Sequence, residues 1–186
     1  MEHEPSPADF IALARRIDRP LVLVGMMGVG KTSVGRKLSA MLRLPFVDAD
    51  EEIERAAQMT IAEMFEQFGE GYFRDGERRV IARLVDGERK ILATGGGAFV
   101  NPETRALILE RATAIWLDCD IEVMLERVKR KDSRPLLRNG DPREILTRLK
   151  AERESAYAEA PIHVTSAGGP HLRTVTRVLK GLEAWL

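Results

Sequence analysis

A phosphate-binding pattern lies early in the chain. Residues 25–32 read Gly-Met-Met-Gly-Val-Gly-Lys-Thr and match G-x-x-x-x-G-K-[ST] directly after the apolar run 20–24. In such a pattern glycines let backbone N–H groups turn around phosphate oxygens, and the following helix directs its positive end at the same anion. Lys31 would reach the β- and γ-phosphates, and the Thr32 hydroxyl would bind Mg²⁺. The pattern predicts a site for a nucleoside triphosphate.

Two carboxylates, Asp48 and Asp50, follow the next apolar run, 44–47. Ligands of open α/β sheets bind beyond the carboxyl ends of the strands, so this pair is placed for chemistry. One carboxylate could hold Mg²⁺ through water, while the other could accept hydrogen bonds from substrate hydroxyls and act as general base. The alternative is that Asp50 is only the N-cap of a helix.

Further polar groups occur at three other places. Gly95, Gly96 and Gly97 follow a third apolar run, where their backbone could approach a ligand closely or form a flexible turn. Arg74 and Glu77 share one helical face, and Arg153 lies in a later helix. The two guanidinium groups have the geometry to bind a carboxylate through paired hydrogen bonds. The alternative is that each arginine is an ordinary surface residue. The basic stretch 129–138 could be a solvated loop or a lid that closes over phosphates.

The composition narrows the function class. With 29 Lys plus Arg and 29 Asp plus Glu among 186 residues, the net charge is zero, which speaks against a nucleic-acid partner. One cysteine, Cys119, excludes an internal disulfide, and no apolar run approaches the roughly 18 residues of a membrane span. The N-terminus lacks a secretory pattern, so we expect a cytoplasmic protein without a membrane partner.

A GTP-dependent switch is disfavoured. No Asp is followed by Gly three positions later, and no Asn is followed by Lys, so neither the D-x-x-G nor the N-K-x-D pattern is present. Motor and assembly ATPases are normally longer. The phosphate loop in a chain of this length therefore favours a small-molecule phosphotransferase.

Hydrophobic periodicity predicts alternating strands and helices. We expect strands at 20–24, 44–47, 91–93, 113–117 and 162–164. We expect helices at 10–17, 51–57, 60–68, 71–86, 102–110, 121–130, 143–160 and 172–185, after a loose start of nine residues. This alternation indicates an α/β fold with a parallel sheet covered on both sides. We expect an extension over 1–17 and a single domain over 18–186, with the lid at about 129–141.

Taken together, these motifs resemble those of shikimate kinase. The resemblance covers about residues 18 to 185 and includes the patterns Phe73-Arg74-x-x-Glu77 and Arg153-x-x-x-Tyr157. Its specific part is the combination of Asp48-x-Asp50, the triple glycine of 95–97 and the Arg-Pro-Leu-Leu of 134–137. It implies a three-layer α/β/α sandwich with a five-stranded parallel sheet of order 2-3-1-4-5. It also implies that ATP phosphorylates the 3-hydroxyl of shikimate on the route to chorismate and aromatic amino acids.

The resemblance also implies roles on the acceptor side. Asp50 would bind the shikimate hydroxyls and serve as base, and Arg74 and Arg153 would clamp the carboxylate. The remaining substrate contacts that it implies are Gly96 and Gly97 as backbone donors, Glu77 orienting Arg74, and Phe65 and Phe73 as apolar walls.

On the nucleotide side, the resemblance implies that ATP and Mg²⁺ are the cofactors. Thr32 and Asp48 would hold the metal, and Lys31, Asp50 and Arg134 would be catalytic. The residues implied to bind nucleotide are Gly28, Val29, Gly30, Lys31, Thr32, Ser33, Arg127 stacked on adenine, and the lid residue Arg134. We expect a monomer with a small-molecule partner.

Some features depart from the family pattern, and two other functions stay open. The segment 166–171 lacks the basic residues that the family often has beside adenine, and residues 1–17 extend beyond the usual start. Asp118 and Asp120 flank Cys119 after a strand. Their spacing resembles that of a metal-binding acidic strand, but a cap of the following helix is the better interpretation. We expect Cys119 to be a small buried side chain. His3, His163 and His171 do not cluster as metal ligands.

The alternatives to shikimate kinase activity are a gluconate kinase of similar fold and a non-catalytic ATP-binding module.

Overall fold

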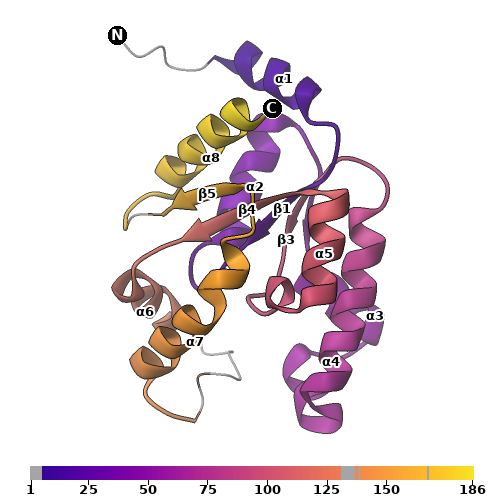
Figure 1. Ribbon diagram of the computed structural model, residues 1–186, viewed down its shortest axis with the longest axis vertical. Helices are drawn as coiled ribbons and strands as arrows, with labels where there is room; N and C mark the ends of the chain where they lie inside the picture. Colours follow the sequence, from indigo (N-terminus) through magenta and orange to yellow (C-terminus); the bar gives the residue numbers. More distant parts are fainter. Residues whose placement is uncertain (1–5, 131–136, 138, 167) are drawn as a thin grey trace.

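The computed structural model describes residues 6–130, 137, 139–166 and 168–186 (Figure 1). Arg134 and most of the predicted lid at 129–141 lie outside this part of the chain.

A parallel sheet forms the centre of the molecule. Its strands lie in the order β2-β3-β1-β4-β5, which confirms the predicted topology. Their bounds are Leu21–Val24 for β1, Phe46–Asp48 for β2, Ile91–Ala93 for β3, Thr113–Asp118 for β4 and Ile162–Thr165 for β5. All residues of β1 and β3 are buried, whereas β5 alternates buried and exposed residues at the edge of the sheet. Central strands covered on both faces need an apolar side chain at every position, which explains the continuous apolar runs.

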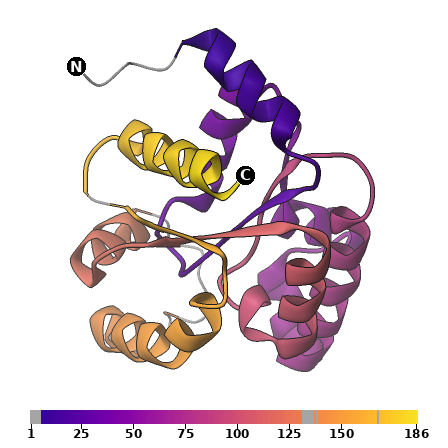
Figure 2. The ribbon, with the colours of Figure 1, turned by 45° about the horizontal axis from the view of Figure 1, so that its top comes forward.

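Helices cover both faces of the sheet, as predicted. Figure 2 shows α1 (Pro7–Arg16), α2 (Lys31–Leu42) and α8 (His171–Trp185) on one side. The other side carries α4 (Ile61–Val85), α5 (Pro102–Arg111) and α7 (Pro142–Tyr157), with α3 (Ala49–Ala57) packed on α4 and α6 (Ile121–Lys129) packed on α7. The hydrophobic core fills the space between the sheet and these two layers.

Helix α1 begins earlier than predicted. We expected nine loose residues, of which 1–5 lie outside the described part of the chain, but α1 begins at Pro7, because Asp9 accepts a 2.7 Å hydrogen bond from the Ser6 amide and caps the first turn. Ile17, just after α1, is buried in the main core. Arg89 closes the other end of α1 by donating to the carbonyls of Ala14 and Ile17, at 2.9 and 3.0 Å.

Two local features of the fold bear on the sequence prediction. The predicted helices 60–68 and 71–86 are confirmed as the two helical stretches of α4, because Gly69 between them has a non-helical backbone with φ of 81°. A short 3-10 helix, η1 (Ala98–Val100), follows the triple glycine, which therefore leads into regular structure.

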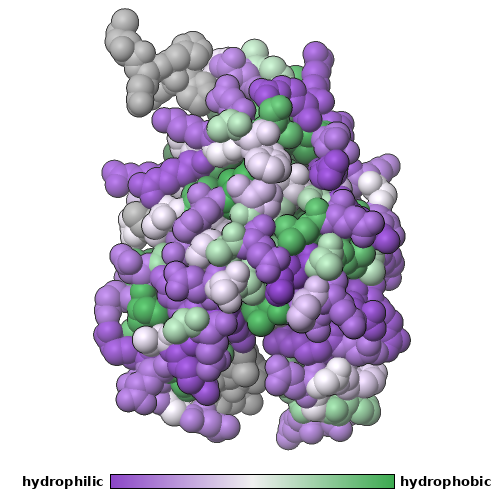
Figure 3. Space-filling view, viewed as in Figure 1, coloured by the Kyte–Doolittle hydropathy of each residue, from purple (hydrophilic) through white to green (hydrophobic). Residues whose placement is uncertain are grey.

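The molecular surface in Figure 3 is mainly hydrophilic, with separate hydrophobic spots. Of the helices that the structure describes, none combines the length and the apolar character that a membrane span requires.

Candidate active site

A cleft of about 310 Å³ lies at the carboxyl ends of the central strands. It is where an open α/β sheet binds its ligands, and the phosphate loop forms one wall. The lining residues are Gly28, Gly30, Lys31, Thr32, Ser33, Asp48, Asp50, Thr94, Gly95, Gly96, Arg127, Arg130 and His171. Most of the candidates on the nucleotide side are therefore in one place.

The phosphate loop joins β1 to α2. Gly30 is the N-cap of α2 with φ of 95°, a left-handed conformation that glycine adopts without steric cost. At Gly25, where φ is 139°, a Cβ would lie 2.3 Å from the Leu117 carbonyl oxygen, so the loop can pass β4 only with glycine there. Lys31 Nζ donates to the carbonyls of Gly25 and Met26 at 2.7 and 2.8 Å. The loop thus holds its cation at the mouth of the predicted phosphate site.

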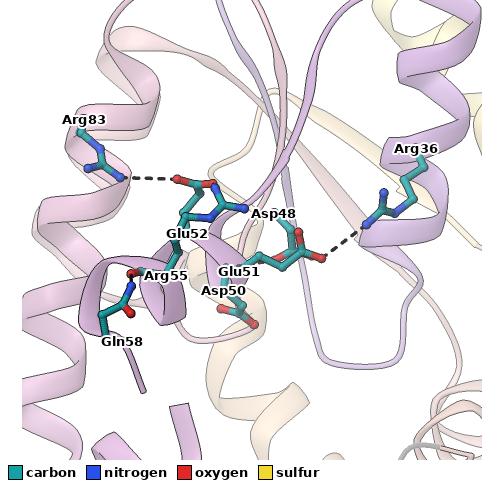
Figure 4. Close-up of polar contacts among 8 residues, drawn as sticks. All are labelled: Arg36, Asp48, Asp50, Glu51, Glu52, Arg55, Gln58 and Arg83. Atoms are coloured by element: carbon teal, nitrogen blue, oxygen red, sulfur yellow. Dashed lines mark hydrogen bonds and ion pairs between the residues drawn. The ribbon is translucent and has the colours of Figure 1, made fainter. Parts of the chain in front are cut away.

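The two aspartates after β2 have different positions. Asp48 is the N-cap of α3, accepting from the Asp50 amide at 3.0 Å, and its other oxygen accepts from the Thr32 hydroxyl at 2.8 Å. The idea that Asp50 is the N-cap is therefore wrong, because Asp48 caps the helix. Figure 4 shows Glu51 directed to Arg36, whereas the Asp50 carboxylate points away from that ion pair. Asp50 lines the cleft.

The triple glycine, residues 95–97, lies in close contact with the candidate residues of the acceptor side. A Cβ on Gly95 would lie 3.0 Å from Asp50 Oδ1 and 3.2 Å from Glu77 Oε2. A Cβ on Gly97 would lie 2.3 Å from the Arg74 guanidinium. Any side chain on Gly97 would displace this arginine. Close approach, rather than a flexible turn, is the reason for glycine here.

Buried charges surround this glycine segment. Arg74 Nη1 donates to Glu77 Oε1 at 2.8 Å, and the Glu77 side chain is 2% exposed. Burial raises the pKa of the Glu77 carboxyl. The charge and hydrogen bond of Arg74 and the charge of Arg153 lower this pKa, but burial has the larger effect. Arg153, 8% exposed, lies with Nη1 3.3 Å from the position of a Gly96 Cβ.

Two of these buried polar atoms lack a hydrogen-bond partner within the described residues, namely Glu77 Oε2 and Arg153 Nη1. A buried donor without a partner is costly. An anionic ligand beside Arg153 would remove that cost, so the arginines are suited to a carboxylate.

The two aromatic candidates, Phe65 and Phe73, pack against each other. The rings of Phe65 and Phe73 are 4.8 Å apart, and Phe73 is 4% exposed in a small core cluster with Ile53 and Met64. Neither ring is among the residues that line the cleft. Phe73 instead packs beneath Arg74, whose guanidinium carbon is 5.1 Å from the ring centroid. Their role as pocket walls remains a prediction.

On the nucleotide side, Arg127 contacts the phosphate loop from α6. Its guanidinium donates to the carbonyls of Gly28 and Val29 at 3.3 and 2.9 Å. The Val29 side chain is fully buried, so this residue offers the cleft only its backbone. Adenine stacking by Arg127 is not tested by these contacts and remains a prediction, as does the role of Arg134.

His171 is a cleft residue that the sequence reasoning missed. Its ring at the start of α8 covers Gly30, with Cε1 2.8 Å from the position of a Cβ there. Burial, followed by the charges of Arg127 and Lys37, lowers the pKa of His171. Nδ1 is buried with no hydrogen-bond partner in the described part of the chain. No motif marks this residue, because only the packing of α8 beside α2 brings it to the loop.

Of the two acidic residues around Cys119, Asp120 is the N-cap residue of α6, as predicted, and Asp118 pairs with a lysine. Asp118 is 3.0 Å from Lys150 Nζ, which also donates to the Cys119 carbonyl at 2.9 Å. Cys119 is 1% exposed, which confirms a small buried side chain, and this burial raises the pKa of its thiol to about 11. Across the described ranges, no cluster of three His, Cys, Asp or Glu residues could hold a metal ion.

Known proteins resemble this chain closely. A family model described as shikimate kinase matches residues 27–183. Shikimate kinase from Novosphingobium aromaticivorans is 62% identical over 193 residues, covering 100% of both proteins. A solved shikimate kinase from Acinetobacter baumannii in complex with shikimate gives a TM-score of 0.86 at 35% identity, covering 89% of this chain and 93% of that one.

A gluconokinase from Sinorhizobium meliloti shares the fold alone, with a TM-score of 0.60 at 18% identity over 92% of this chain and 95% of that one. The matched range 27–183, by contrast, includes Lys31, Asp50, Arg74 and Arg153, which meet around the phosphate loop and the triple glycine. With this match and a relative 62% identical along the whole chain, the protein belongs to the shikimate kinase family.

Proposed function

We propose that this protein transfers the γ-phosphoryl group of ATP to the 3-hydroxyl of shikimate, giving ADP and shikimate 3-phosphate. The observation that carries the proposal is the position of Gly96, where a Cβ would lie 3.4 Å from the Met27 amide nitrogen and 3.3 Å from Arg153 Nη1. Gly96 therefore lies between the phosphate loop and the arginine that would bind the carboxylate. Direct transfer between two small substrates requires the two binding sites to be this close.

On the donor side, we assign the triphosphate to the phosphate loop. Backbone N–H groups of 28–33 and the N-terminus of α2 would hold the β- and γ-phosphates. Lys31 would exchange its loop carbonyl partners for phosphate oxygens, since its ammonium group already lies within the loop. Arg127 would stabilise the loop from outside through its contact with the Val29 carbonyl.

On the acceptor side, we assign the shikimate carboxylate to Arg74 and Arg153. Arg74 is held by Glu77, and Arg153 Nη1 is a buried donor that an anion would satisfy. Asp50 would accept hydrogen bonds from the ring hydroxyls and take the proton of the attacking one. Shikimate carries one carboxylate and three hydroxyls, which matches this set of groups.

A magnesium ion fits between the two sides. The Thr32 hydroxyl and the Asp48 carboxylate are 2.8 Å apart and supply oxygen ligands alone, the kind that Mg²⁺ prefers. Mg²⁺ is usually held by one or two protein groups together with substrate phosphates and water, so a larger acidic cluster is not needed. When bound, the ion would neutralise phosphate charge, and Thr32 and Asp48 would hold it.

The transfer would be in line and without a covalent enzyme intermediate. Positioning and charge neutralisation supply most of the rate in phosphoryl transfer. Lys31 would face the developing charge from the loop, and Arg134, outside the described residues, would approach from the lid. We also propose that the protein acts as a monomer in the cytoplasm, where ATP and small metabolites are available.

One experiment separates the candidate functions. ADP release would be measured with ATP, Mg²⁺ and either shikimate, gluconate or no acceptor, and the product position would be read by phosphorus NMR. We expect ADP release that requires shikimate and yields the 3-phosphate. Equal release with gluconate would contradict the substrate assignment, and absence of release with every acceptor would indicate a non-catalytic ATP-binding module.

A further inference from the structure

Tyr157, the last residue of α7, reaches from the core to the triple glycine. Its hydroxyl donates a hydrogen bond to the Gly96 carbonyl, and its side chain is 1% exposed. The Trp116 ring lies beside the phenol, with the two ring centroids 5.9 Å apart. A buried hydroxyl of this kind could serve stability alone, so its effect on the site depends on what the Gly96 carbonyl controls.

The Gly96 carbonyl and the Gly97 N–H belong to the same peptide group. That group is planar and trans, so the carbonyl and the N–H point in opposite directions and rotate together. Glycine on both sides gives this peptide access to many orientations, because no Cβ restricts it. The bond from Tyr157 therefore selects one orientation of the Gly97 N–H.

The same peptide lies between the two halves of the cleft. The position of a Gly96 Cβ is 3.3 Å from Arg153 Nη1 on the acceptor side and 3.7 Å from the Gly25 carbonyl oxygen on the phosphate side. The Arg74 guanidinium lies against Gly97. A rotation of this peptide would change the contacts that face the acceptor, while the phosphate loop is held by its own glycines and by Lys31.

We infer that Tyr157 is a positioning residue that, by holding the Gly96 carbonyl, orients the Gly97 N–H toward the acceptor's polar groups. The inference rests on the proposed function, since it assigns that backbone donor to shikimate. Burial raises the pKa of Tyr157, against the opposing effect of Arg153, so the phenol stays protonated and remains a donor at neutral pH.

The test is Tyr157→Phe, which keeps the ring and removes the hydroxyl. We expect KM for shikimate to rise roughly five- to tenfold, as for a lost buried hydrogen bond, with KM for ATP within about twofold of wild type. A purely structural role would lower the melting temperature and leave the ratio of the two KM values unchanged. An unchanged shikimate KM, or equal changes for both substrates, would overturn the inference.

Two control variants separate the hydroxyl from general loosening. Trp116→Leu removes the neighbouring ring but keeps the hydroxyl; we expect a lower melting temperature with a shikimate KM near wild type. Ser39→Ala removes a similar hydroxyl-to-carbonyl bond, 2.6 Å to Leu44, far along α2. If either control raised the shikimate KM as much as Tyr157→Phe does, loosening rather than orientation would explain the effect, and the inference would fail.

Failure of this inference is distinguishable from failure of the proposed function. Absence of shikimate-dependent ADP release by the wild-type protein would contradict the function itself. Wild-type activity combined with an unaffected Tyr157→Phe variant would contradict only the role of Tyr157.

Discussion

Asp50 is the residue on which the proposed proton transfer depends. It lines the cleft beside Gly95 and leaves the capping of α3 to Asp48. We expect Asp50→Asn to lower kcat by roughly a hundredfold or more, because an amide cannot take the proton. KM for ATP should change little, since Lys31 and the loop remain.

Steady-state kinetics with shikimate test this expectation, and Asp86→Asn is the matched control. Asp86 is exposed and paired with Arg111 at 2.7 Å, so losing its charge should leave the rate unchanged. Turnover of Asp50→Asn at the wild-type rate would exclude an essential base.

Arg153 offers a second test at the residue scale. Its Nη1 is a buried donor facing the triple glycine, so we expect Arg153→Ala to raise KM for shikimate roughly tenfold or more, as for loss of a charged hydrogen bond. Arg74→Ala should act in the same direction. Arg83→Ala, an exposed arginine 3.6 Å from Glu52, serves as the control. Unchanged shikimate KM values in both site variants would remove the carboxylate clamp from the proposal.

His171 predicts a pH dependence of stability. Its pKa in the folded protein is lowered from the ordinary 6.5, chiefly by burial. The unfolded chain then binds the proton more readily, so stability from this residue is present above pH 6.5 and is lost as pH falls toward the folded pKa. We expect melting temperature to fall less in His171→Asn than in wild type between about pH 7.5 and about pH 5.5.

Thermal melts at both pH values measure the difference. His163→Asn is the comparison, because it also removes an imidazole, one that is half-exposed and stacked on Trp116. Equal effects of the two variants would contradict a specific role of His171.

At the scale of elements, α2 packs on the sheet so closely that Gly35 leaves no room for a methyl group. A Cβ there would lie 2.4 Å from the Phe46 ring. We expect Gly35→Ala to destabilise the protein by about 1–3 kcal/mol through overpacking. Adding Phe46→Leu should recover part of the loss, because the two sites share one contact.

Denaturant unfolding of the single and double variants measures this coupling. Gly76→Ala in α4 is the control, because a Cβ there meets nothing within 4 Å. It should raise stability by about 0.5–1 kcal/mol through the better helix propensity of alanine. Strictly additive effects of Gly35→Ala and Phe46→Leu would show that the close contact does not limit this packing.

The elements themselves were largely predictable. Strands such as β1 and β3 are short apolar runs bounded by proline or glycine, and their local signal is strong. The start of α1 was missed because a capping pair, Ser6 and Asp9, outweighed the polar composition around it. The division at Gly69 was predicted correctly, because the backbone there leaves the helical conformation between the two helical stretches of α4.

At the scale of the whole molecule, a chain of zero net charge carries a cleft with local charge. Its lining includes three cationic residues, Lys31, Arg127 and Arg130, together with the carboxylates of Asp48 and Asp50. A small anionic nucleotide and a small carboxylate suit this distribution better than a polymer does, because the charged groups are gathered within a cleft of small volume.

The sequence by itself determined the phosphate loop, the sheet order through its family resemblance, and the identity of Asp50, Arg74 and Arg153 as candidates. Each depends on a local motif, in which residue type and spacing carry the chemistry. The tertiary structure alone decided that His171 covers Gly30 and that Tyr157 holds Gly96. These contacts join residues far apart in the chain, and the packing of α7 and α8 around the sheet creates them, so no local pattern could specify them.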